Sequence, residues 1–360
     1  MERGATGPAR SFRIETAGRG ARAAAACACI ILPALALLPA VAGRNLIQEL
    51  IFLFYMLALA QCWNLLAGYA GLISVGQQAF VGLGGYVLFA LTLLGGINPL
   101  LAIPLAGLVS AMFALPTALI VFRLRGAYFA IGTWVVAEVY RLVFAQFKPL
   151  GGGTGTSLTP SITSSVPGIE WVRTLLDVRA PAARDVISYW VALALAAGTL
   201  ALVYVILRSR RGLALGAIRD QEAAAAGLGV DIYRIKLAVY VATSAMTGMI
   251  GALIYLQKAR ISPDAAFSVL DWTAYVIFIT VIGGIGTMEG PVIGAIIFYL
   301  MQRYLADFGA WYLILLGTLG ILVMLSAPKG LWGLVSERFE LTFFPTRRRL
   351  VAKDEDCHRA

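Results

Sequence analysis

The sequence predicts an all-α membrane protein, a polytopic helical bundle with about ten membrane-spanning helices (range about eight to eleven) and both chain ends on the cytoplasmic side. Three observations predict this. Of 360 residues, 60% are hydrophobic and only 13% are charged, whereas soluble domains carry about 25% charge. The apolar residues form runs of about 20, the length that crosses a bilayer core as a helix. Basic residues gather between these runs.

Helices are the expected spanning elements because each backbone N–H and C=O in the bilayer core must be bonded within the protein. Their expected positions are about 23–43, 45–66, 72–95, 98–122, 127–147, 187–207, 237–257, 270–290, 291–308 and 310–327. They form one membrane domain over 23–328, between a basic cytoplasmic tail at 1–22 and a charged cytoplasmic tail at 329–360. This organisation leaves no room for a soluble catalytic domain.

The basic residues set the orientation of the helices. The net charge is +10, and most of the Lys and Arg fall in 1–22, 123–125, 208–236 and 329–360. These segments alternate with the predicted spans as cytoplasmic segments do under the positive-inside rule. The prediction is therefore N-in and C-in, and orientation explains the basic excess without nucleic acid as a partner.

The first apolar run has two possible readings. Arg22, the run that follows and the small triplet Ala40-Val41-Ala42 resemble a cleavable signal peptide. We expect a retained helix instead, because the run is long and more spans follow. The four cysteines form no CxxC pair and the lone His358 lies in a charged tail, so we expect no disulfide framework, no metal site and no catalytic residue.

Three breaks interrupt the apolar pattern. Residues 61–86 mix amides and glycines, a composition that belongs inside a bundle rather than against lipid. An outer loop over about 148–186 opens with GGGTGT, which lacks the lysine of a phosphate-binding P-loop. The inner loop over about 208–236 is rich in helix formers from 214 to 228 and predicts one short helix on the cytoplasmic face.

These segments closely resemble the branched-chain amino acid ABC permease family, in particular the longer of its two paralogous membrane subunits. The matching stretches are NLLAGYAGLISVGQQAF (64–80), RLRGAYFAIGTWVVAEVYRLV (123–143), RRGLALGAIRDQEAAAAGLGVDIYRIKLAVY (210–240) and VIGGIGTMEGPVIGA (281–295). Two departures lie near the expected solute route. Gln77 stands where the family usually has histidine, and GGGTGT replaces a sequence closer to TGGTGG.

The resemblance implies that the inner helix couples the chain to a separate ATPase. The expected coupling residues are Arg219, Asp220, Glu222, Ala223, Ala224, Gly227 and Gly229. Alanines permit close approach to a partner, and the charged side chains can pair across the contact. An ordinary solvated connector helix is the alternative.

Neutral polar side chains at membrane depth are the candidates for a solute pathway, because they can bind a zwitterionic or amide solute weakly. They are Asn64, Ser74, Gln77 and Gln78, with Tyr128 and Thr133 as weaker candidates. Interhelical hydrogen bonding without solute contact is the alternative. Glu138 and Arg141 share a helix face and either pair with each other or contact solute.

A second glycine cluster, Gly283, Gly284, Gly286 and Gly290, predicts a hairpin in which backbones approach closely. We expect these glycines to serve helix packing.

The resemblance implies a permease subunit of a binding-protein-dependent importer for branched-chain amino acids or related small polar solutes such as urea or amides. Implied partners are a paralogous permease subunit, two ATP-binding cassette subunits that bind ATP and Mg, and an extracytoplasmic solute-binding protein. The implied location is a bacterial cytoplasmic (inner) membrane. An ion-gradient-driven transporter is the alternative, although Glu138 is the one acidic residue well inside a predicted span. A membrane enzyme is disfavoured because the chain lacks paired carboxylates and HExxH.

Overall fold

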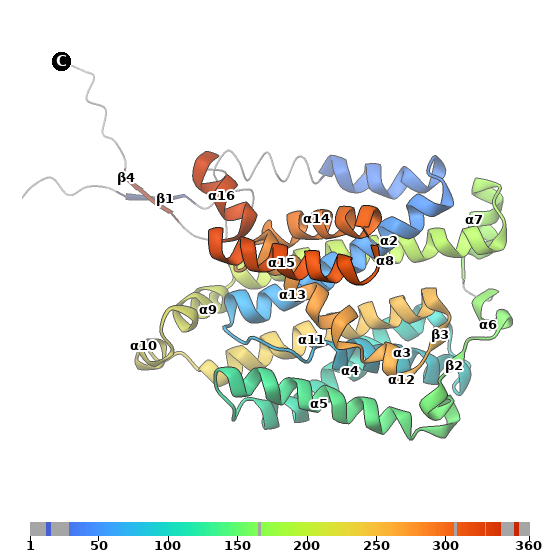
Figure 1. Cartoon of the computed structure of the whole chain (residues 1–360), viewed down its shortest axis with the longest axis horizontal. Coiled ribbons are helices and arrows are strands. Elements are labelled where there is room, and N and C mark those ends of the chain that lie inside the picture. Colours follow the sequence, from blue (N-terminus) through green and yellow to red (C-terminus); the bar gives the residue numbers. More distant parts are fainter. Residues whose placement is uncertain are drawn as a thin grey trace, which may run out of the picture.

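The computed structural model describes residues 12–15, 29–164, 167–305, 308–327, 329–339 and 349–352. The helices run roughly side by side and form an elongated bundle (Figure 1). A helix lies in each of the ten predicted segments: Cys29–Ala40, α2 (Arg44–Asn64), α3 (Gln77–Leu93), α4 (Pro99–Val121), α5 (Ala127–Ala145), α8 (Ala180–Arg208), α11 (Ile232–Lys258), α13 (Tyr275–Gly283), α14 (Gly290–Leu305) and α15 (Ala310–Ser326). The predicted all-α membrane bundle is confirmed.

Seven segments in the described part are long and apolar enough to cross a bilayer. They are Arg44–Tyr69, Pro99–Val121, Ala127–Ala145, Ala180–Arg208, Ile232–Lys258, Pro263–Gly283 and Leu313–Ser336. Two of them extend the helices named above, since a π-helical turn (Leu65–Tyr69) prolongs α2, and α12 (Pro263–Ala266) and a second π-helical turn (Leu270–Ala274) precede α13. The last runs from α15 into α16 (Gly330–Phe339).

The third predicted span, 72–95, is wrong at its start. Residues 70–76 are not helical, and α3 begins only at Gln77. Gly71 has φ +68°, a left-handed conformation that ends the helical turn before it. Most of this segment is buried in protein, which is the setting where irregular backbone is tolerated at membrane depth.

The two polar loops contain more structure than the sequence indicates. The outer loop holds β2 (Thr156–Ser157), α6 (Pro160–Ser164) and α7 (Ile169–Leu176), and α8 begins at Ala180 rather than near 187. In the inner loop, the single helix expected over 214–228 is wrong, since two helices occur, α9 (Arg210–Asp220) and α10 (Glu222–Gly227). They are separated by Gln221, whose extended backbone (φ −161°, ψ 109°) breaks the helical path.

Helix α11 packs against α3 and α4 in the middle of the bundle, and α2 packs against α8. Small residues allow the closest approach. A Cβ at Gly84 of α3 would lie 2.0 Å from the carbonyl oxygen of Gly248 in α11, and one at Gly251 would lie 2.2 Å from that of Val81. This is the small-residue packing by which membrane helices associate.

Apolar side chains cover the outside of the bundle along α4, α5 and α15. Exposed residues on α4 include Leu101, Leu108, Met112, Leu119 and Ile120. Because a bilayer core is as apolar as these side chains, this surface suits contact with lipid. The chain is thus a multi-pass membrane protein.

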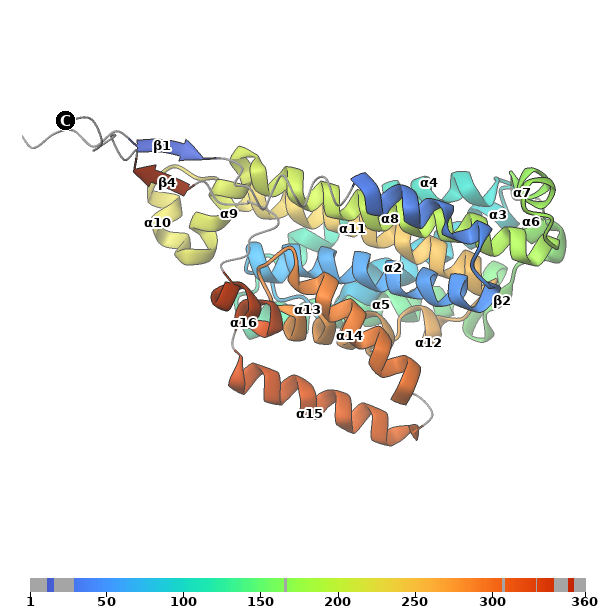
Figure 2. The same ribbon diagram turned by 90° about the horizontal axis from the view of Figure 1, so that it is seen from above.

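Two short strand pairs lie at opposite ends of the bundle (Figures 1 and 2). β1 (Phe12–Glu15) pairs antiparallel with β4 (Arg349–Ala352), so segments near the two chain ends meet on one side. β2 pairs antiparallel with β3 (Arg260–Ile261), which joins the outer loop to the end of α11. Most of the predicted tails, 1–22 and 329–360, lies outside the described residues.

Gly84→Ala tests the close contact of α3 with α11. The added methyl group meets the Gly248 carbonyl, so we expect the free energy of unfolding in detergent to fall by about 1–3 kcal/mol. Gly198→Ala is the control, since this exposed glycine of α8 has open space around it and helix propensity alone favours alanine by up to about 1 kcal/mol. Equal stability of the two variants would contradict the packing described here.

Candidate functional site

The inner end of α2 holds the glycine-rich turn between α13 and α14 through side-chain amides. Gln61 Nε2 donates to the carbonyl oxygen of Met288 at 2.6 Å. Asn64 Nδ2 donates to the carbonyl oxygen of Thr287 at 2.7 Å, and Asn64 Oδ1 accepts from the N–H of Gly286 at 2.8 Å. Three backbone groups of the turn 284–289 are therefore satisfied by two side chains of one helix.

Glycines permit this contact. A Cβ at Gly68 would lie 2.6 Å from the Gly286 nitrogen and 2.5 Å from Asn64 Oδ1. Gly286 itself has φ +75°, which L side chains rarely adopt. Gly283 and Gly290 face each other across the hairpin, since a Cβ at Gly283 would lie 1.9 Å from the Gly290 carbonyl oxygen. With Gly284, the four glycines singled out in the sequence all lie in or beside this turn.

Helix α9 contacts the same turn. A Cβ at Gly286 would lie 2.7 Å from Nη1 of Arg219, so the Arg219 guanidinium lies directly against the turn. The side chain of Glu222, at the start of α10, pairs with Lys236 of α11. The α9–α10 pair is thus joined to the bundle through α11 and through the 284–289 turn.

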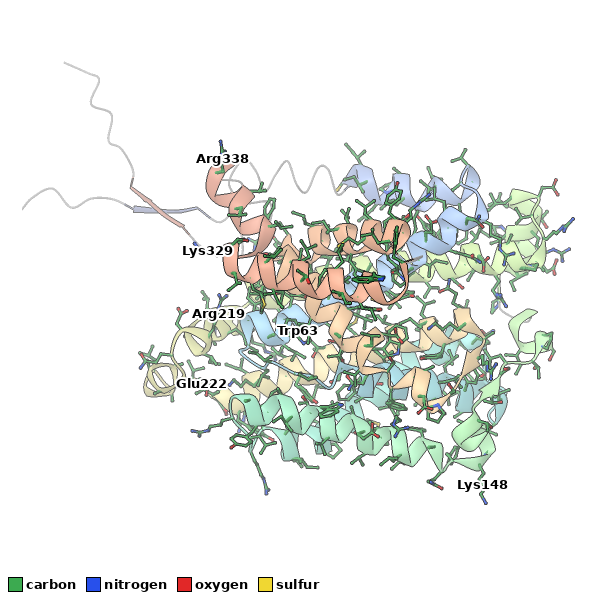
Figure 3. All side chains as sticks on the ribbon, in the orientation of Figure 1. Trp63, Lys148, Arg219, Glu222, Lys329 and Arg338 are labelled. Atoms are coloured by element: carbon green, nitrogen blue, oxygen red, sulfur yellow. The ribbon has the colours of Figure 1, made fainter. Side chains whose placement is uncertain are left out.

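The remaining expected coupling residues lie on the surface. Arg219 and Glu222 project at the end of the bundle opposite Lys148 of the outer loop (Figure 3). Ala225 of α10 is buried, whereas Leu228 just after it is 81% exposed. Exposed residues also include Asp220, Ala223, Ala224, Gly227 and Gly229. Glu222 therefore pairs within its own chain, while the small side chains around it leave an accessible apolar surface.

Four of the expected pathway residues gather where α3 begins. Val75 N–H donates to Thr133 Oγ1 at 3.0 Å, and Gly76 N–H donates to Ser74 Oγ at 3.2 Å. Gln77 Nε2 donates to the carbonyl oxygen of Leu59 at 3.0 Å, and Thr273 Oγ1 donates to Gln78 Oε1. Ser74, Gln77, Gln78 and Thr133 are all buried. Their solute-contact role stays a prediction, and each makes a hydrogen bond inside the bundle.

Asn64 and Tyr128 lie apart from this group. Asn64 binds the 284–289 turn, and Tyr128 is 73% exposed near the start of α5. Two buried acceptors, Gln61 Oε1 and Gln77 Oε1, have no hydrogen-bond partner within the part of the chain that the structure describes. Sequence reasoning left out Gln61 and Thr273 as site residues, although Gln61 lies three residues before Asn64 in the same polar segment and on the same helix face.

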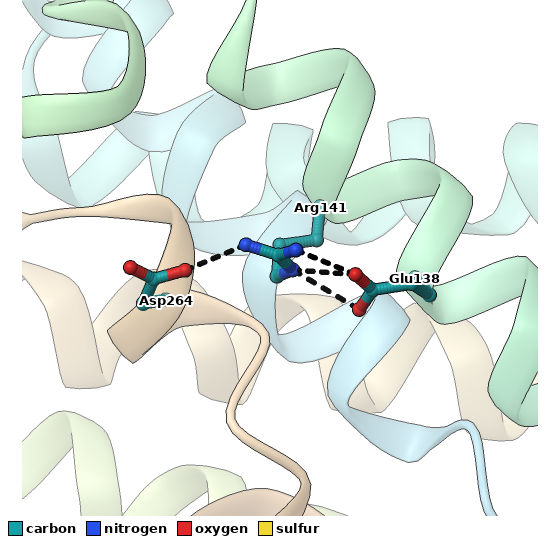
Figure 4. Close-up of polar contacts among 3 residues, drawn as sticks. All are labelled: Glu138, Arg141 and Asp264. Carbon is teal, nitrogen blue, oxygen red and sulfur yellow. Dashed lines mark hydrogen bonds and ion pairs between the residues drawn. The ribbon is translucent and has the colours of Figure 1, made fainter.

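The outer end carries a separate charged group (Figure 4). Arg141 Nη2 lies 2.6 Å from Glu138 Oε1 on α5, and Arg141 Nη1 lies 2.6 Å from Asp264 Oδ1 on α12. Glu138 and Arg141 thus pair with each other, and Arg141 also links α5 to α12. All three side chains are partly or largely exposed.

No group of three or more His, Cys, Asp or Glu that could hold a metal ion occurs among the residues that the structure describes. Cys62 is buried and Cys29 is exposed, both as free thiols. Cys27, Cys357 and His358 lie outside the described residues.

Comparison with known proteins agrees with this architecture. Residues 45–324 match the family described as branched-chain amino acid transport system / permease component. The chain is 28% identical over 343 residues to the "High-affinity branched-chain amino acid transport system permease protein LivM" of Salmonella typhimurium and to the protein of that name from Escherichia coli, covering 85% of this chain and 80% of each relative. A "Probable branched-chain amino acid transport permease protein LivM" of Methanocaldococcus jannaschii is 26% identical over 252 residues, 64% of this chain and 66% of that protein. No solved structure matches the chain.

Asn64→Ala tests the clamp on the 284–289 turn. The variant loses one donor and one acceptor, so we expect a loss of about 1–3 kcal/mol in the free energy of unfolding and faster amide hydrogen exchange across 284–289. Asn98→Ala is the control because Asn98 only caps α4, where its Oδ1 accepts from the N–H of Leu100 at 3.0 Å. Unchanged exchange at 284–289 in Asn64→Ala would show that the clamp does not hold the turn.

Proposed function

The chain belongs to the branched-chain amino acid transport system permease component family, and on this premise we propose that it is one membrane subunit of a binding-protein-dependent ABC importer. The subunit provides half of the transmembrane route, and separate subunits hydrolyse ATP. The observation that carries the proposal is the α9–α10 pair, an exposed helical projection on the inner side that is joined to the bundle.

A permease that receives work from a separate ATPase needs a surface to which the ATPase can bind. The accessible alanines of α10 and the exposed Leu228 suit a groove in such a partner, because small side chains allow the backbone to approach closely. Exposed apolar side chains beside a polar rim are typical of protein interaction sites. Helix α10 is therefore the proposed docking element.

The contacts of α9–α10 support two routes for the transmission of force. The first runs from Arg219 to Gly286 and on to Asn64 of α2. The second runs from Glu222 to Lys236 near the start of α11, which packs on α3 and α4. A displacement of α10 would thereby act on α2 and on α11. The polar residues buried where α3 begins, Ser74, Gln77, Gln78 and Thr133, lie within the same bundle.

The proposed substrates are branched-chain amino acids or a related small polar solute such as urea or an amide. Support comes from the names of the relatives and from the neutral amides and hydroxyls buried at Asn64, Ser74, Gln77, Gln78 and Thr133. Such groups suit a solute that must bind weakly and leave.

The proposed partners are a paralogous permease subunit, two ATP-binding cassette subunits that hold ATP and Mg, and an extracytoplasmic solute-binding protein. The proposed location is the bacterial cytoplasmic membrane. In this assignment the chain is a transport subunit and not an enzyme.

Reconstitution separates this proposal from an ion-gradient-driven transporter. The chain is placed in proteoliposomes with its permease, ATPase and binding-protein partners, and uptake of radiolabelled leucine is measured. We expect uptake that requires ATP and all partners. Accumulation by vesicles that contain the chain alone, under an imposed proton or sodium gradient, would refute the importer assignment.

Gly227→Trp and Glu222→Arg test the docking element. Gly227 has open space around it and is exposed, so a tryptophan fits the fold but obstructs a partner. Glu222→Arg places two like charges together at Lys236. We expect uptake to fall by about tenfold, within the range of ordinary coupling free energies, while ATP hydrolysis and membrane insertion persist.

Matched substitutions elsewhere serve as controls. Gly198→Trp alters an equally open glycine of α8, and Glu170→Arg breaks the exposed outer pair with Arg173. We expect both to retain uptake. Full uptake by both inner-face variants would contradict the coupling role of α10.

A further inference from the structure

An open pocket of about 490 Å³ lies between the outer halves of α2 and α14. Its volume is within the range of about 300–1,000 Å³ usual for small-molecule sites. Positions three and four residues apart on each helix face it. Its walls include Gln48, Glu49 and Phe52 from α2 and Tyr299, Gln302 and Arg303 from α14.

Glu49 and Arg303 form an ion pair in this pocket, and each has hydrogen-bonding atoms that the pair does not use. Glu49 Oε2 accepts from Tyr299 OH at 2.5 Å and from Arg303 Nη1 at 2.6 Å. Arg303 Nη1 also donates to Tyr299 OH at 2.8 Å. Within the described residues, Glu49 Oε1 and the Nε and Nη2 atoms of Arg303 take part in no hydrogen bond. A carboxylate has two accepting oxygens and a guanidinium has five N–H donors, so both groups can bind a further ion without breaking their pair.

One other feature of the wall favours a ligand of mixed character. The Phe52 ring is half-buried and stacks on Phe298 with ring centroids 6.1 Å apart, which fixes an apolar surface beside the charges. The pocket therefore combines an anion, a cation and an aromatic face.

We propose that this pocket binds a zwitterionic α-amino acid with an apolar side chain. Its ammonium group binds Glu49 Oε1, its carboxylate binds the free N–H groups of Arg303, and its side chain packs on Phe52. Charge-assisted hydrogen bonds of this kind are the strong ones. A zwitterion also adds no net charge beside the Glu49–Arg303 pair. As a place where solute first meets the permease, the site rests on the proposed importer function.

A phosphatidylethanolamine headgroup offers the same pair of charges, an ammonium group and an anion. The test therefore uses the full chain in nanodiscs made from phosphatidylglycerol, and repeats it with phosphatidylethanolamine added. Saturation-transfer NMR then measures binding of L-leucine, of isocaproate, which lacks the ammonium group, and of isoamylamine, which lacks the carboxylate.

We expect leucine to bind and both single-charge analogues to bind at least about tenfold more weakly, because a hydrogen bond to a charged group is lost in each case. Glu49→Gln and Arg303→Gln should weaken leucine binding to a similar extent, and Arg303→Lys should weaken it less. Arg173→Gln is the control, since it removes an exposed outer arginine with a comparable ion pair on α7. If one variant fails to insert, the other two remain decisive.

Equal leucine affinity in the wild type, Glu49→Gln and Arg303→Gln would overturn the site. So would displacement of leucine by phosphatidylethanolamine together with loss of that lipid from Glu49→Gln in native mass spectrometry, because the occupant would then be a headgroup. In the reconstituted importer, Glu49→Gln should raise the leucine concentration at half-maximal uptake by about tenfold. If the wild type shows no ATP-dependent uptake but still binds leucine in the nanodisc, the importer role fails and the pocket stands.

Discussion

The hydrogen bonds from Gln61 and Asn64 hold the turn 284–289, one of the breaks in the regular helices of this bundle, against α2. Polar backbone groups removed from water and left unbonded cost free energy, so such breaks occur where protein satisfies them. Here two amides of α2 satisfy Gly286, Thr287 and Met288. Side chains also bond the backbone of the non-helical segment 70–76. Trp63 Nε1 donates to the Ser74 carbonyl oxygen at 2.8 Å, and the N–H of Val75 donates to Thr133 Oγ1.

This clamp also determines what helix α9 can contact. Gly286 lacks a side chain, so Arg219 of α9 lies directly against the turn that Asn64 holds. The exposed surface of α9 and α10 is therefore linked to α2 through Arg219, Gly286 and Asn64. At the outer end ion pairs join the helices, with Arg44 Nε 2.6 Å from the buried Asp185 and Arg141 between Glu138 and Asp264. An ion pair also serves the inner end, where Glu222 binds Lys236.

The length of the apolar runs and the positions of the basic residues were enough to predict the membrane bundle and a helix in each of its ten segments. The bilayer imposes both of these sequence features. The sequence marked 61–86 as an interruption but not where the backbone leaves the helix. The predicted span began at 72 because Leu72, Ile73 and Val75 are apolar, whereas Gly71 has a left-handed backbone and α3 begins at Gln77. For the candidate site, composition identified the residue types but not their partners. Asn64 and Gly286 are 222 residues apart, and no local pattern indicates that they meet. The break between α9 and α10 at Gln221 was not predicted, because helix-forming residues lie on both sides of it.

The pairing of β2 with β3 connects the end of α11 to the outer loop. This helix starts beside Lys236, where α10 is attached, and ends at the strand pair that fastens the outer loop. Its 27 residues make a rod about 40 Å long. A tilt of such a rod by about 10° about one end would carry the other end through about 7 Å. A small rocking motion at the α10 end would therefore swing the outer loop without any change in the helix itself.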